Sequence, residues 1–400
     1  MSRVRERPWS GELKQAGLAL ALLWLIGASL RVTLLAVPPL LPTIHQALAL
    51  TETGVGLLTG LPMGLLAATT VIGSLLVARL GAREALLLGL VLEALGGALR
   101  GLGASALVLY SMTVLMGLGI AICQPALPSL VMQWTPRRTD LATALYSNGM
   151  LVGEIVAAAL TAPLLLGLAD GSWALGLLVW SIPVGLTALA VWLLTPASPP
   201  RPGAVQRRWW PDWRSGRTWR LGLALGCGSI TYFGSNTFIP EYLHAQGQEG
   251  LIAPALTSLN VLQLPASFLI AALPSRLVAR RGPFVVAGGA AVLGLLGLLL
   301  TGAQWTVLWS GLVGFGAGAV FILSLALPPR LSAPHEVHLL SAAMLTIAYV
   351  CGLLGPLIGG ALWDLTGLPA AAFAVIVAAN LLLIRLAASL ALDAPPAELG

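Results

Sequence analysis

The 400-residue sequence predicts an all-α polytopic membrane protein with twelve transmembrane helices. Its composition is the first reason, because 58% of the residues are hydrophobic and 9% are charged, whereas a soluble domain usually has about 25% charged residues. Apolar runs of suitable length are the second reason, since about 20 mostly apolar residues cross a bilayer. The third reason is that basic residues gather in alternate connections between those runs.

The apolar runs follow one another between turn and charge signals, which sets their approximate ends. The first run is longer than the apolar part of a signal peptide and has no small-residue cleavage site, so we expect it to be retained. The predicted spans are residues 16–38, 54–77, 84–101, 106–132, 141–166, 173–195, 219–243, 251–276, 284–302, 305–328, 339–363 and 369–391.

With twelve spans, both chain ends lie on the same side of the membrane. That side collects every lysine and arginine of the sequence except Arg31, Arg100 and Arg385. Because basic residues are enriched on the cytoplasmic side, we expect a protein of the cell inner (cytoplasmic) membrane with both termini in the cytoplasm. Arg100 is the one basic residue expected on the opposite side.

A polar stretch in the middle of the chain predicts a boundary between two parts. Residues 196–218 are rich in proline and then interleave arginine with tryptophan, which is typical of a linker on the cytoplasmic membrane surface. Nucleic-acid binding by this basic stretch is the alternative, and we do not expect it. We therefore expect one six-helix bundle over residues 1–195 and another over 219–400. Weak internal repeats favour two parallel halves related by a pseudo-two-fold axis. The repeated residues include Ser111 with Ser310 and Gly117 with Gly316.

Ionisable residues inside the predicted spans mark the strongest candidate site, because each is costly in a bilayer and usually faces the protein interior. Arg31 and Glu154 lie roughly 20 Å from the cytoplasmic side, in spans that run in the same direction. Their side chains can therefore meet. They would form either a structural ion pair, or a site in which Arg31 binds a polar or anionic substrate and Glu154 carries a proton. Glu93 lies less deep, and we expect it to have a structural partner.

Neutral polar residues within the spans complete the predicted pathway. Each of them is equally compatible with a hydrogen bond to a neighbouring helix, worth roughly 1 kcal/mol. Asn236 and Gln263 stand out because Gly234 and Pro265 loosen the helices beside them. The predicted substrate-binding residues are Arg31, Gln124, Tyr232, Asn236, Gln263 and Tyr349, and the predicted proton-coupling residue is Glu154.

Several classes of function are excluded or disfavoured. The sequence contains no GxxxxGK[ST] phosphate-binding motif, so we expect neither an ATP-hydrolysing enzyme nor a cofactor. The three cysteines show no disulfide or metal-ligand spacing. His335 and His338 flank Glu336, where a zinc site is the alternative to a solvated loop. We favour the loop and expect no bound metal.

Short segments of the sequence resemble the major facilitator superfamily, and within it the cyanate and nitroimidazole porters. Arg31, followed by Pro39-Leu40-Leu41-Pro42, resembles the first-helix arginine and the turn of that branch, although Ser29 and Val32 replace its asparagine and proline. Ala78-Arg79-Leu80-Gly81 resembles the superfamily's loop after the second span. Further resembling segments are Gly117-Leu118-Gly119, Gln263-Leu264-Pro265-Ala266, Gly355-Pro356 and Asp364-Leu365-Thr366-Gly367.

The resemblance implies the major facilitator fold and alternating-access transport of a small polar or anionic solute, with Arg31 in the cavity. The expected partners are a small-molecule substrate, the lipid bilayer and protons, and the chain is expected to act as a monomer. A proton-driven multidrug exporter is one alternative, because Gly355-Pro356 resembles the exporters' glycine-proline motif. A membrane sensor that binds a ligand without transporting it is the other. Symport and antiport remain open.

Overall fold

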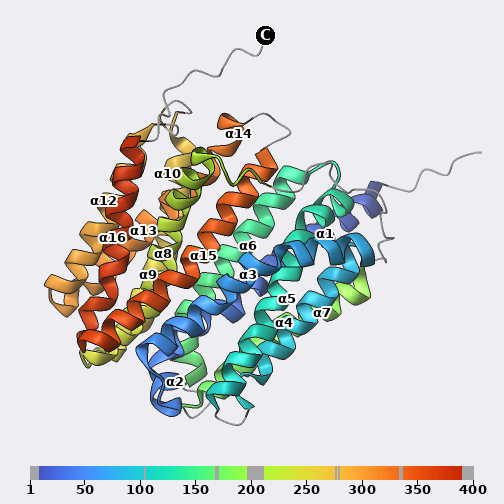
Figure 1. Ribbon diagram of the computed structural model, residues 1–400. Helices are drawn as coiled ribbons and strands as arrows, with labels where there is room; N and C mark the ends of the chain where they lie inside the picture. The colour runs from blue at the N-terminus through green and yellow to red at the C-terminus, as the bar shows by residue number, and fades with distance from the viewer. Residues whose placement is uncertain are drawn as a thin grey trace, which may run out of the picture.

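The computed structural model describes residues 9–102, 105–166, 171–195, 211–274, 277, 280–332 and 337–389. These residues form helices and connecting turns, and none of them belongs to a β-strand. The long helices run side by side as one bundle, with α2 at one end and α14 at the other (Figure 1). Helices up to residue 195 gather on one side of the bundle and helices from residue 211 on the other. We call these the first and second halves.

Each half contains long helices joined by short elements. Those of the first half are α1 (Trp9–Leu35), α3 (Glu52–Leu80), α4 (Ala82–Leu99), α5 (Ala106–Trp134), α6 (Thr139–Leu160) and α7 (Trp173–Leu194). Those of the second half are α8 (Gly216–Ala245), α9 (Ile252–Val261), α10 (Gln263–Ala272), α12 (Arg281–Leu300), α13 (Thr306–Leu325), α15 (Val337–Thr366) and α16 (Ala374–Ser389). The shorter helices α2 (Leu41–Leu48) and α14 (Pro328–Leu331) lie in connections.

The helices are those of a multi-pass membrane protein. In the part of the chain that the structure describes, nine segments are long and apolar enough to cross a membrane. The helices α3, α4 and α8 run beside these segments in the bundle (Figure 1). They coincide with three further predicted spans. The exact number of twelve crossings goes beyond the nine segments and stays a prediction.

The structure differs from the predicted series of spans in two places. The predicted span 251–276 is divided at Leu262 into α9 and α10. Pro265 lies just after this break. It has no backbone N–H to donate to the carbonyl four residues earlier, and its ring crowds that carbonyl, which explains why the helix does not run through. The connection after α1 contains the unexpected helix α2, which ends where Ala49 takes a left-handed conformation with φ 48°.

Two predicted features fall largely outside the described residues. The linker 196–218 is described only from residue 211 onward, and α8 begins at Gly216. The bounds of the linker and of the two bundles therefore stay predictions. His335 and Glu336 also lie outside the described residues. Of the three cysteines, Cys123 and Cys227 are buried and Cys351 is half-buried, and all three are free.

Candidate functional site

Helices α1 and α6 approach each other closely because glycines line their contact. A Cβ atom on Gly149 would lie 2.2 Å from the carbonyl oxygen of Trp24, and one on Gly153 would lie 2.5 Å from the carbonyl oxygen of Ala28. No side chain fits at these separations, so the two backbones touch through glycine. Such small-residue contacts are a common way for membrane helices to pack.

This glycine contact brings Arg31 and Glu154 together as an ion pair. Arg31 Nε lies 3.3 Å from Glu154 Oε1, and the two side chains are 17% and 8% exposed. Arg31 is one helical turn beyond Ala28, and Glu154 directly follows Gly153. The separation of the helices therefore sets the separation of the charges. The two residues predicted to lie at similar depth do meet in the structure.

Polar side chains of the second half face this pair. Tyr232 on α8 and Gln263 on α10 lie beside the Glu154 carboxylate. The Tyr232 hydroxyl donates a 2.8 Å hydrogen bond to Oδ1 of Asn260, and Gln263 Nε2 donates a 3.4 Å bond to the same oxygen. Asn260 and Gln263 are three residues apart, so their side chains lie on the same face across the junction of α9 and α10.

Two further predicted residues extend the polar region. Tyr349 on α15 lies near Arg31, and its hydroxyl donates a 3.1 Å hydrogen bond to Oε1 of Gln124 on α5. Asn236 accepts a 3.3 Å hydrogen bond from Nδ2 of Asn260. All six predicted substrate-binding residues and Glu154 therefore belong to one connected polar region, to which both halves contribute. Asn260 also belongs to this region, although the sequence did not place it among the predicted binding residues.

A cavity lies next to this region, toward the α2 end. Its lining includes Asn236 and Thr237 from the second half, and Thr59, Thr113 and Arg100 from the first. The rest of the lining is apolar, from leucine, valine, proline, methionine and phenylalanine side chains, so the polar groups form only part of the cavity wall. Of the predicted binding residues, Asn236 thus lies where the Arg31 region and this cavity meet.

The arrangement around Arg31 is suited to exchanging one anion for another. A guanidinium group is planar, carries five N–H donors and matches the oxygens of a small anion. Glu154 occupies it now. If another anion replaced Glu154, the carboxylate would remain buried without its cationic partner, which is costly for a charged group. Protonation of Glu154 would remove that cost.

A second buried polar group lies in the first half. The Thr33 hydroxyl donates a 2.8 Å hydrogen bond to Oε1 of Glu93, which gives Glu93 the structural partner expected of it. Arg100 is 1% exposed, and its Nη2 donates a 3.0 Å hydrogen bond to the Thr33 carbonyl oxygen. Arg100 thus lies inside the bundle near the end of α4 and not on the membrane surface. Its position at the end of an apolar run gave no sign of this burial.

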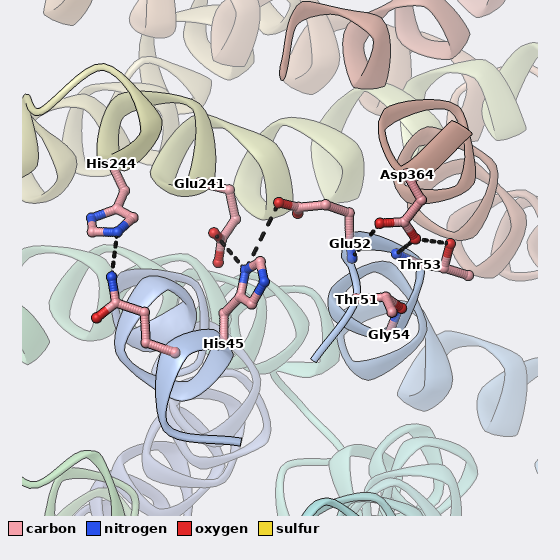
Figure 2. A network of polar contacts seen from close by, with 9 residues as sticks. His45, Thr51, Glu52, Thr53, Gly54, Glu241, His244 and Asp364 are labelled. Atoms are coloured by element: carbon pink, nitrogen blue, oxygen red, sulfur yellow. Dashed lines mark hydrogen bonds and ion pairs between the residues drawn. The ribbon is translucent and has the colours of Figure 1, made fainter. Parts of the chain in front are cut away.

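Direct polar contacts join the two halves at the α2 end (Figure 2). Asp364 on α15 accepts hydrogen bonds of 2.9 Å and 2.8 Å from the backbone N–H groups of Glu52 and Thr53, which begin α3. Farther into the bundle, the Thr237 hydroxyl donates a 2.8 Å hydrogen bond to the Thr59 hydroxyl. These contacts hold the halves against each other at this end. None of these residues was among the predicted site residues.

Known transporters resemble the chain over most of its length. The family model of the Major Facilitator Superfamily matches residues 20–356. A 2-nitroimidazole transporter of Escherichia coli (strain K12) is 30% identical over 348 residues, which cover 86% of this chain and 87% of that protein. The cyanate transport protein CynX of the same organism is 28% identical over 352 residues, or 87% of this chain and 90% of that protein.

Two solved structures share the arrangement of the helices. A bacterial homologue of the human lysosomal transporter Spinster superposes with a TM-score of 0.75 at 18% identity, covering 96% of this chain and 97% of the other. The nucleoside transporter NupG superposes with a TM-score of 0.75 at 12% identity, covering 95% and 99%. At these identities the likeness concerns the fold.

Proposed function

This chain belongs to the major facilitator superfamily, and from that premise we propose that it moves a small polar or anionic solute across the inner membrane by alternating access. Its family and its relatives make it a membrane transporter of the cyanate and nitroimidazole porter type. The observation that carries the proposal is the Arg31–Glu154 ion pair, which faces polar side chains of the opposite half.

The surroundings of the pair favour a transport role over a purely structural one. A buried ion pair contributes little to stability, because the cost of removing two charges from water offsets their attraction. Tyr232, Gln263 and Tyr349 come from the second half and would move away from the pair if the halves rock. A solute bound between the halves would contact both sets of groups.

Competition for Arg31 would couple solute and proton. A solute anion that binds Arg31 releases Glu154, and the released carboxylate takes up a proton because its charge is no longer balanced. The anion and the proton then cross together without net charge. After both leave, Glu154 returns to Arg31 and the empty carrier reorients. We therefore propose a symport of one small anion with one proton.

The relatives suggest which solutes to test first. One is named a 2-nitroimidazole transporter and another a cyanate transport protein. Cyanate is a small monovalent anion that a single guanidinium can hold, and 2-nitroimidazole is a small polar heterocycle. Both fit a site made of one arginine, one carboxylate and several amide and hydroxyl groups.

The test is uptake by proteoliposomes that hold the purified protein. Labelled cyanate and labelled 2-nitroimidazole are compared with and without an imposed proton gradient, for wild type, Arg31→Ala and Glu154→Gln. We expect anion uptake to be lost in Arg31→Ala. In Glu154→Gln we expect uptake that no longer responds to the proton gradient.

The matched control is Arg385→Ala, which removes another arginine from a predicted span, on α16. It should transport as wild type does. Uptake in Arg31→Ala at the wild-type rate would make the pair structural and would favour the multidrug exporter. Binding of a solute without any uptake would favour the sensor.

The proposed orientation has its own test. With both termini in the cytoplasm, residue 207 would lie on the cytoplasmic side, and the α2 end of the bundle would lie on the opposite side of the membrane. A cysteine at position 207 in a background without the native cysteines should react with a membrane-impermeant maleimide only in inverted vesicles. Labelling in intact cells would contradict this orientation. Because one chain supplies every residue of the proposed site, we also propose that the monomer transports.

A further inference from the structure

Three side chains converge at the α2 end, apart from the proposed solute site. Nδ1 of His45 lies 3.1 Å from Oε2 of Glu241 and 3.8 Å from Oε1 of Glu52. One ligand atom from each of the three residues lies within 4.8 Å of the others. Figure 2 shows the His45 ring between the two carboxylates.

Each of the three residues is held by a helix end or a buried helix face. His45 lies on α2, whose Leu41, Pro42 and Ile44 are buried in the first half. Glu52 is the first residue of α3, and its own backbone N–H is bonded by Asp364. Glu241 is 3% exposed on α8 in the second half. The cluster is therefore built on three separate elements and connects both halves.

The two carboxylates have more acceptor atoms than the cluster has donors. Glu52 Oε2 and Glu241 Oε1 are buried, and neither has a hydrogen-bond partner among the residues that the structure describes. Within the described residues, both carboxylates form their ion pairs with His45. One imidazole cannot balance two buried carboxylates, even when it is protonated. A bound divalent cation would balance both carboxylates in their ionised form, whereas without a cation one of them must take up a proton.

The ligand set and spacing select the kind of cation. Zinc binds histidine nitrogen and carboxylate oxygen at about 2.0–2.2 Å, so two ligands on one tetrahedral ion lie about 3.4 Å apart. The two separations from His45, 3.1 Å and 3.8 Å, lie on either side of that value, and the ligand atoms of all three residues lie within 4.8 Å of one another. Calcium and magnesium prefer sites made only of oxygen ligands, whereas an imidazole ligand suits zinc, copper, iron and nickel.

We propose that His45, Glu52 and Glu241 form a binding site for a divalent transition-metal ion, with zinc as the best fit, that joins the two halves at the α2 end. Glu241 lies 196 positions beyond His45 in the chain, so no metal-ligand spacing marks the three residues, and no metal was predicted from the sequence. Three protein ligands leave one position of a tetrahedral ion open to water. If the halves separate at this end during transport, as the proposed function requires, a bound ion would hold them closed and slow transport.

The test measures metal binding directly, so it does not depend on transport. Untagged full-length protein in detergent is treated with a chelator, dialysed and titrated with Zn²⁺ by calorimetry, and thermal unfolding is followed with and without Zn²⁺. We expect one Zn²⁺ per chain, a higher unfolding temperature with Zn²⁺, and no comparable effect of Mg²⁺. Loss of one ligand in His45→Ala, Glu241→Gln or Glu52→Gln should weaken binding about tenfold or more and remove the thermal shift.

The matched control is His244→Ala. His244 lies on α8 one turn beyond Glu241, but it contacts Gln46 and Glu249 and not the cluster. It should bind Zn²⁺ as wild type does. The proposal is wrong if wild type binds no Zn²⁺, or if His244→Ala loses as much affinity as His45→Ala. It is also wrong if the two glutamine variants keep wild-type affinity, since both preserve side-chain shape and would remain folded if His45→Ala did not.

Discussion

The Asp364 carboxylate accepts a 2.8 Å hydrogen bond from the backbone N–H of Thr53, so the end of α15 in the second half caps the beginning of α3 in the first. The first N–H groups of a helix have no partners within the helix, and the positive end of the helix dipole favours a negative charge there. In this chain the capping charge comes from the other half. Any motion that separates the halves at this end must break the cap.

Replacing this carboxylate should therefore loosen the contact between the halves. We expect Asp364→Asn to lower the free energy of unfolding by about 1 kcal/mol or less, because the side chain is exposed and caps of this type contribute about that much. Thermal unfolding in detergent measures the change. Glu249→Gln is the control, since Glu249 is also exposed but pairs with His244 within the same half. Equal losses in both variants would show that the contact of Asp364 with the other half adds no stability.

A double-mutant cycle separates the two interpretations of the ion pair. Arg31→Gln leaves Glu154 buried and unpaired, which should cost about 3–5 kcal/mol in stability. Adding Glu154→Gln removes the second charge, so the double variant should regain most of that loss but transport no anion. Thermal unfolding and proteoliposome uptake of the four proteins provide the cycle. A double variant that regains both stability and transport would show that the pair is only structural.

The sequence was sufficient to predict that Arg31 and Glu154 can meet. The depths of Arg31 and Glu154 follow from counting residues along two apolar spans, because a membrane helix has a fixed rise and must remain in the bilayer. Polar residues in an apolar span usually face the protein interior, so Tyr232, Gln263 and Tyr349 were predicted to line the pathway, but not to lie beside the pair. Their position beside the pair comes from the structure.

Contacts that depend on how separate helices pack could not be predicted. His45 and Glu241 are separated by 196 positions, and only the docking of α2 against α8 brings them together. Arg100 lies at the end of an apolar run, where a loop position and a buried position give the same local pattern. Asn260 joins the polar region through its hydrogen bond with Tyr232 on α8, and the sequence does not show which polar side chains of two spans meet.

The glycine contact between α1 and α6 should be sensitive to a single methyl group. A Cβ at position 153 would lie 2.5 Å from the Ala28 carbonyl oxygen, so Gly153→Ala should force the helices apart and separate Arg31 from Glu154. We expect a loss of about 1–3 kcal/mol in stability and a strong loss of anion uptake. Thermal unfolding and uptake measure the two effects.

The matched control is Gly289→Ala on α12. A Cβ at position 289 meets nothing within 4 Å, and alanine favours a helix over glycine by about 1 kcal/mol. This variant should be as stable as wild type or more stable, with normal uptake. If both alanine variants behaved alike, the close approach of α1 and α6 would not set the geometry of the pair.

The hydrogen bond from Tyr349 to Gln124 gives the last prediction, because it connects the halves beside Arg31. Tyr349→Phe keeps the ring and removes one hydrogen bond, which is worth about 0.5–1.5 kcal/mol. If Tyr349 contacts solute, KM for uptake should rise by roughly twofold to tenfold, as that free energy implies. Tyr242→Phe is the control, since Tyr242 packs edge-on against Phe373 away from this region. A fall in stability with an unchanged KM would place Tyr349 in the contact between the halves and outside the solute site.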